Sequence, residues 1–107
     1  MSAVMSKPPR KLSTQMAAVL LILNADPNLM ERVKPFINLE NETIFWESIL
    51  KMSLGSGHRA AITWAYGAWT DELRPRSNPF DAALSLTPNL QVAVLKALAL
   101  RWGLKVS

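Results

Sequence analysis

The residues best suited to bind a ligand lie in one short segment, Gly55-Ser56-Gly57-His58-Arg59. Glycines let the backbone approach a bound group, a helix N-terminus presents free N–H groups, and Arg59 adds positive charge. Ser56, His58 and Arg59 are therefore candidates for an anion site that holds a phosphate or a carboxylate. The Lys-Ser/Thr pair of a nucleotide-binding loop is absent. A tight turn, in which Gly55 ends one helix and Ser56 caps the next, accounts for the same residues, and we favour it.

Catalytic chemistry has few candidate groups in this chain. There is no cysteine and one histidine, which excludes disulfides, thiol nucleophiles and zinc sites built on Cys and His pairs. Ser56 and His58 are close enough in sequence for nucleophilic catalysis, but capping is the simpler role for both at a helix start. The spacing of Glu42 and Glu47 does not require an acid–base pair. We expect no enzymatic activity, no metal and no cofactor.

Length and composition indicate one folded domain. The chain has 107 residues, of which 50% are hydrophobic and 19% are charged, so it carries too much apolar surface for a disordered chain. The longest apolar run, Met16 to Leu23, is too short to cross a bilayer, for which about 20 residues are needed. Basic residues precede this run, as in a signal peptide, but Leu23 is large where cleavage requires a small residue. We expect a cytoplasmic protein with no membrane contact.

Helix start signals divide the chain. Residues 1–11 contain Pro8-Pro9 and three basic side chains, and we expect them to form a mobile basic tail before a single helical domain at 12–107. Ser13 is a good N-cap, and a capping residue followed by proline occurs at 26–27, 78–79 and 87–88. The expected helices are 14–24, 27–34, a third from Asn41 or Thr43 to Gly55, then 57–73, 79–85 and 88–103. No segment alternates long enough to predict a strand. The fold class is all-α, a compact bundle of five or six short helices.

The last helix has too few polar residues to form one solvent-exposed polar face. Between Leu90 and Trp102 the polar residues are Gln91, Lys96 and Arg101, each about 140° around the helix from the one before it. Either the first and last helices pack on each other at the centre of the bundle, or a second subunit covers part of them. We predict a homodimer. The candidate interface residues are Trp64, Val94, Leu98 and Trp102.

The helix expected at 57–73 carries a polar stripe. Arg59, Thr63, Tyr66 and Thr70 fall on one side, where we expect them to be exposed and to offer a docking stripe for a polar partner. Our leading hypothesis is a non-enzymatic helical protein–protein interaction module of unknown process. The partner, beyond a second copy of the chain, is not identified by the sequence.

The charge distribution supports one alternative function. Residues 1–25 carry a net charge of +3, residues 26–47 of −3 and residues 48–107 of +4. The basic tail and the Arg74–Arg76 loop could contact phosphates in a nucleic-acid-binding accessory protein. However, no helix carries the exposed Arg, Lys, Asn and Gln of a recognition helix, and no strands offer an aromatic platform for bases.

The second half of the chain resembles a group of small helical proteins. The residues that carry this resemblance are the Gly55-Ser56-Gly57 turn, the segment from Trp64 to Trp69, and the ending from Ala99 to Gly103. In these residues, which span 55–103, the chain is similar to small helical proteins of bacterial genomes and prophages. The resemblance implies a bacterial or phage origin and carries no functional residue with it.

Overall fold

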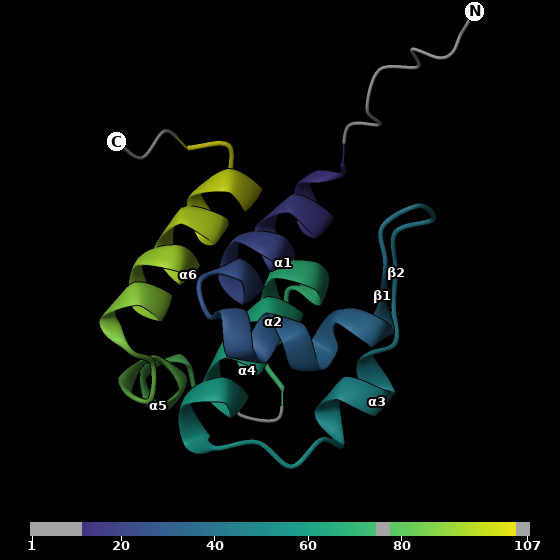
Figure 1. Cartoon of the computed structure of the whole chain (residues 1–107). Coiled ribbons are helices and arrows are strands. Elements are labelled where there is room, and N and C mark those ends of the chain that lie inside the picture. The colour runs from purple at the N-terminus through teal and green to yellow at the C-terminus, as the bar shows by residue number, and fades with distance from the viewer. Residues whose placement is uncertain (1–11, 75–77, 105–107) are drawn as a thin grey trace, which may run out of the picture.

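The chain folds as the all-α bundle that the sequence predicts. This computed structural model describes residues 12–74 and 78–104, so the basic tail expected at 1–11 lies outside the described residues. Six α-helices, a 3-10 helix (η1) and a short hairpin make up the described part (Figure 1). In chain order they are α1 (Thr14–Asn24), α2 (Pro27–Val33), η1 (Lys34–Phe36), β1 (Ile37–Asn38), β2 (Thr43–Ile44), α3 (Trp46–Leu50), α4 (Ser56–Thr70), α5 (Pro79–Leu84) and α6 (Pro88–Arg101).

Side-chain caps fix where four of these helices begin. Ser13 accepts a hydrogen bond from the Met16 N–H at the start of α1. The side chains of Asp26, Asn78 and Thr87 cap α2, α5 and α6 in the same way, each followed by proline at the first helical position. A cap of this kind typically contributes about 1 kcal/mol, and the proline loses nothing because its missing N–H would have no helical partner. The predicted starts of these helices are confirmed.

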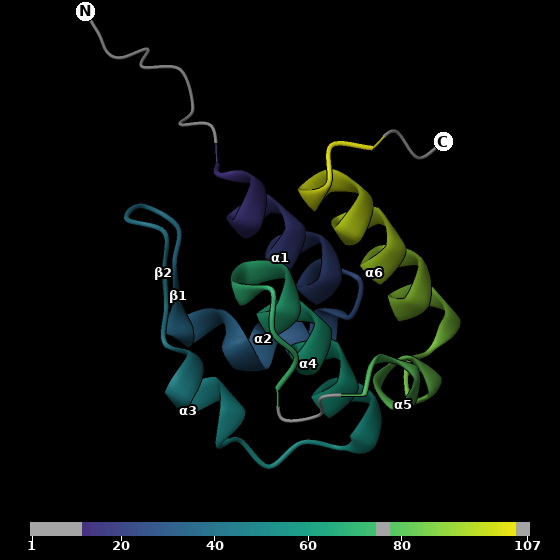
Figure 2. The same cartoon turned by 180° about the vertical axis from the view of Figure 1, so that it is seen from behind.

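The core forms where α1, α4 and α6 meet. α1 packs against both α4 and α6, and the last two also contact each other (Figures 1 and 2). α1 contributes large side chains, whereas α4 contributes mainly alanines, which let its backbone approach closely. The first and last helices therefore do pack on each other, as one of the two sequence hypotheses required. The fully buried large side chains include Met16, Val19, Ile22, Leu23, Ile62 and Leu90.

The prediction of a third helix, from Asn41 or Thr43 to Gly55, is wrong over most of that range. Residues 37–44 form an antiparallel hairpin instead, with Ile37 opposite Ile44, and only Trp46–Leu50 is helical. Glu42 adopts a left-handed backbone with φ of 53°, and its carboxylate accepts a hydrogen bond from the Ser13 N–H. A contact between residues 29 positions apart leaves no local signal in the sequence. Gly55 also does not end α3, because it is the N-cap residue of α4.

Arg101 ties the end of α6 to the end of α4. Its Nε donates to the carbonyl oxygen of Ala68 over 2.6 Å, and its Nη2 donates to Oδ1 of Asp71 over 2.7 Å. Asp71 closes α4 in the left-handed conformation, with φ of 69°. These two bonds fix the orientation of α6 at its C-terminal end, so they determine which side of α6 faces outward.

Candidate interaction surface

Three large apolar side chains on α6 and at its end are more than half exposed. Val92 is 51% exposed, Leu95 is 64% exposed and Trp102, at the end of the helix, is 67% exposed. At 100° per residue these three lie on the side of α6 opposite its core-facing residues. We call Val92, Leu95 and Trp102 the α6 ridge. The ridge contains no charged residue, so no charge in it opposes transfer out of water.

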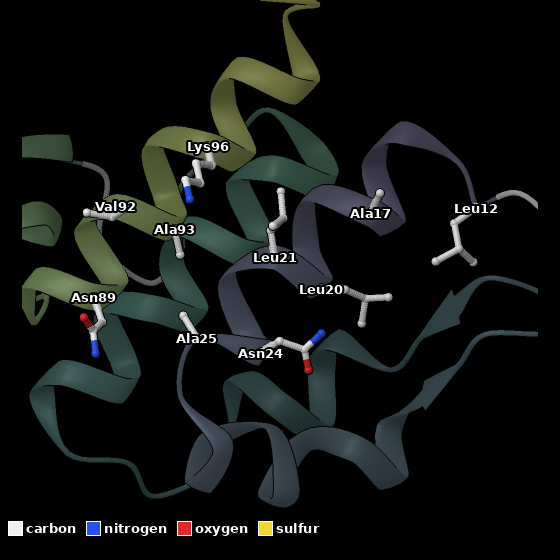
Figure 3. A pocket seen from close by; sticks show the side chains of 10 residues that line it. All are labelled: Leu12, Ala17, Leu20, Leu21, Asn24, Ala25, Asn89, Val92, Ala93 and Lys96. Carbon is white, nitrogen blue, oxygen red and sulfur yellow. The ribbon is translucent and has the colours of Figure 1, made fainter. Parts of the chain in front are cut away.

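A shallow apolar groove lies between α1 and α6 and borders one side of the ridge. Its volume is about 670 Å³. Leu21, Ala93 and Lys96 lie between the two helices, whereas Leu20 points away from α6 (Figure 3). Lys96 is the one charged residue that lines the groove, and no carboxylate lines it. The full lining is Leu12, Ala17, Leu20, Leu21, Asn24, Ala25, Asn89, Val92, Ala93 and Lys96.

A second, smaller hollow lies on the other side of the ridge. Its volume is about 330 Å³, and it brings together Trp64, Leu98 and Trp102, three of the four predicted interface residues. Trp64 is partly buried against the core, and its Nε1 is buried with no hydrogen-bond partner among the described residues. Gly67 admits the side chain of Leu73, whose Cδ2 would lie 2.8 Å from a Cβ atom at that position. At this glycine the close approach is thus made by a side chain of the same chain.

Two of the predicted interface residues are covered within the chain. Val94 is buried in the core, and Leu98 packs against it. Helical spacing did not distinguish them from Val92 and Leu95 because α6 is apolar on every side, so no polar face marked the direction of solvent. The apolar surface that α6 offers to a partner is therefore the ridge, which shares Trp102 with the prediction.

The predicted polar docking stripe is not an exposed stripe. Thr63 is fully buried, and its Oγ1 donates to the carbonyl oxygen of Arg59. Thr70 donates in the same way to the carbonyl oxygen of Tyr66. The Tyr66 ring meets Trp46 edge-on at 5.1 Å between centroids, and the Arg74 guanidinium lies 5.7 Å from its centre. Back-bonded threonine hydroxyls need no outside partner, so a stripe of polar residues on a helix can face inward.

The candidate anion site holds a carboxylate of the chain itself. Nε2 of His58 lies 2.8 Å from Oδ2 of Asp26, while Ser56 is the exposed first residue of α4 rather than its cap. Asp26 therefore places negative charge beside the predicted anion-binding residues. Neither His58 nor Asp26 lines the groove or the smaller hollow described above.

Opposing effects act on the Asp26 carboxyl. Partial burial would raise its pKa, but hydrogen bonds from the backbone N–H groups of Leu29 and Asn28 and the bond and charge of His58 together hold the pKa below its ordinary value. Within residues 12–74 and 78–104 no group of His, Asp and Glu side chains is arranged to hold a metal ion. No helix in the same ranges is long and apolar enough to span a bilayer.

Comparison with protein-family models, with curated proteins and with solved structures finds no match to this chain. Of the residues named for nucleic-acid binding, Arg74 is described at its place over Tyr66, whereas Arg76 and the tail lie outside the described residues. The nucleic-acid alternative stays a prediction.

Proposed function

We propose that this protein is a self-associating helical module that forms a symmetric homodimer through the α6 ridge. The observation that carries the proposal is the ridge itself: three uncharged, large side chains, each more than half exposed, on the side of α6 opposite the core. A helix that is apolar on all sides favours burial on all sides. The chain covers one side of α6 with α1 and α4, and a second copy would cover the other.

The exposed apolar area on and beside the ridge can be compared with the area that a dimer interface buries. Three further leucines are also exposed: Leu21 on α1, Leu100 on α6 and Leu104 in the turn after α6. With the ridge they leave roughly 250–470 Å² of apolar surface in water, taking about 60–120 Å² for a buried aliphatic side chain and 150–250 Å² for an aromatic one. A standard interface buries about 800 Å² per partner, somewhat more than half of it apolar. These side chains thus expose a large part of the apolar area that a dimer interface requires.

Symmetry makes a second copy a suitable partner for this surface. In a two-fold dimer the same patch lies on both sides of the interface, so an uncharged patch meets an uncharged patch. A carboxylate or ammonium group buried without a partner would oppose association, and the ridge contains neither.

A pair of charge substitutions tests the proposal. Leu95→Asp places a carboxylate in the centre of the ridge and should convert the dimer to a monomer at tens of micromolar in light scattering after size exclusion. Leu39→Asp, at the exposed hairpin 37–44, is the matched control and should leave the mass unchanged. Circular dichroism establishes that both variants keep the helical fold. If Leu95→Asp leaves the mass of a dimeric protein unchanged, the interface does not lie on the ridge.

A further inference from the structure

The outward side of α1 is apolar and only partly covered. Four of its residues line the groove between α1 and α6 at the spacing i, i+3, i+4 and i+7, which places them on one side of the helix: Ala17, Leu20, Leu21 and Asn24. Leu21 is 38% exposed, and α1 contains no charged residue. A helix whose outer side carries no charge favours burial of that side.

α6 presents a second stripe with the same spacing. Its residues that line the groove are Asn89, Val92, Ala93 and Lys96. α1 and α6 lie side by side and run in opposite directions, so the two stripes form the two walls of one groove of about 670 Å³ (Figures 1 and 3). Each stripe covers about two turns of helix, or about 10 Å.

We propose that this groove binds an amphipathic helix of another protein, with the apolar side of that helix between the two stripes and an acidic side chain beside Lys96. The inference goes beyond the proposed self-association. The groove shares Val92 with the ridge but lies on the α1 side of α6. The bound helix would contact α1 and α6 from outside, as α4 contacts them from inside.

The walls of the groove favour a helix as the occupant. Between the ends of α1 and α6 the backbone N–H and C=O groups are hydrogen-bonded within each helix, so the walls offer no backbone partner to an extended peptide. A helix satisfies its own backbone groups. Its side chains at i, i+3, i+4 and i+7 have the same spacing as the two walls, as packing of one helix into the groove between two others requires.

Lys96 determines the charge that the occupant should carry. Lys96 is exposed, and it is the one charged residue that lines the groove. No ion pair among the described residues includes it, whereas Arg101, the other charged residue of α6, is paired with Asp71. A carboxylate on the bound helix would therefore meet an ammonium group that has no carboxylate beside it.

The helices of this chain do not meet these requirements. α1, α4 and α6 contain no Asp or Glu, and the helices that do, α2, α3 and α5, have seven, five and six residues. α5 exposes Phe80 and Leu84 next to Asp81, but Asp81 already interacts within its own chain. Residues 1–11 contain basic residues and no Asp or Glu, so they would bring like charge to Lys96. We therefore assign the occupant to another protein.

Selection from a displayed peptide library tests the proposal. The library consists of helices of about 15 residues, long enough to form in water, with apolar residues fixed at i, i+3, i+4 and i+7 and the other positions random. The full chain, immobilised, should retain peptides enriched in Asp and Glu. Fluorescence anisotropy of a labelled, recovered peptide then gives its dissociation constant.

Substitutions in the groove determine where the peptide binds. Lys96→Glu should raise the dissociation constant about tenfold, and replacing the acidic residue of the peptide with Lys should restore binding to this variant. Leu21→Glu, which places a charge on the α1 wall, should raise it about thirtyfold. Lys51→Glu makes the same charge change at an exposed residue outside the groove and should change it less than about twofold. Circular dichroism checks that each variant keeps the helical fold.

The outcomes separate this inference from the proposed function. Recovery of no peptide, or of peptides without acidic residues, would overturn the inference. Binding that is lost in Leu95→Asp but kept in Leu21→Glu would place the peptide on the ridge and would also overturn it. A chain that is monomeric in light scattering but binds an acidic peptide in the groove would contradict self-association and leave this inference standing.

Discussion

Asp26 joins two helices through its two carboxylate oxygens. Oδ1 accepts hydrogen bonds from the N–H groups of Asn28 and Leu29, at 3.1 and 3.2 Å, and so caps α2. Oδ2 lies 2.8 Å from Nε2 of His58 in the first turn of α4. The same side chain that begins one helix thus holds the start of another, 32 residues further along the chain.

This arrangement predicts a specific acid sensitivity. The pKa of Asp26 is lower in the folded chain than its ordinary value, so the carboxylate stabilises the fold above the ordinary pKa and loses this contribution as the pH falls through the lowered one. We expect the urea concentration at the midpoint of unfolding to decrease as the pH is lowered from about 5 to about 2. Asp26→Asn keeps a capping side chain but does not titrate, so its midpoint should fall less steeply.

Urea unfolding followed by circular dichroism across this pH range measures the difference. Other carboxylates titrate in both proteins, and their contribution cancels when the two curves are subtracted. Parallel curves would show that Asp26 is not stabilised as a carboxylate by its partners.

The sequence predicts helix starts well because they depend on neighbouring residues. Asp26-Pro27 and Thr87-Pro88 each contain a capping side chain and a residue that fits only the first turn, so two positions determine the boundary. The hairpin could not be found in this way. Its strands have two residues each, and Glu42 reaches a partner in α1 that no local pattern indicates.

The candidate surface was predicted to the right helix but not to the right side of it. Val94 and Leu98 have the same apolar character as Val92 and Leu95, and the difference between the pairs is set by where α1 and α4 lie. A helix with a polar face would have shown its orientation. Here only the folded bundle distinguishes the inner from the outer side.

A second prediction concerns Arg101, which links α6 to α4. Arg101→Ala removes two hydrogen bonds from a charged donor and leaves the carbonyl of the buried Ala68 without this partner. We expect a loss of about 1.5–3 kcal/mol in the free energy of unfolding. Arg101→Lys should recover little, because one ammonium group cannot reproduce the fork of a guanidinium. Full recovery in Arg101→Lys by urea titration would show that only the charge matters.

A third prediction uses salt to separate the two candidate functions. Association through an uncharged ridge should change little between low and moderate salt, whereas binding to phosphates weakens steeply as salt rises. Sedimentation velocity should therefore give similar dimer fractions at both salt concentrations. A gel shift with duplex DNA or RNA that is present at low salt and lost at moderate salt would instead support the nucleic-acid alternative.

A fourth prediction concerns a competing apolar pair on α5. Phe80 is 79% exposed and Leu84 is 80% exposed, more than any residue of the α6 ridge. They lie on a helix of six residues, and neither of them lines the groove between α1 and α6 or the smaller hollow beside Pro79. Phe80→Asp should therefore leave the mass in light scattering unchanged. Loss of the dimer in Phe80→Asp would move the interface to α5.

The most direct test of the account is the mass of the unmodified chain in solution. Sedimentation equilibrium at tens of micromolar should give a molar mass near twice the 11.9 kDa of one chain, returning toward that of one chain on dilution. A molar mass of a single chain at every concentration would show that the exposed side of α6 stays in water, and would contradict self-association.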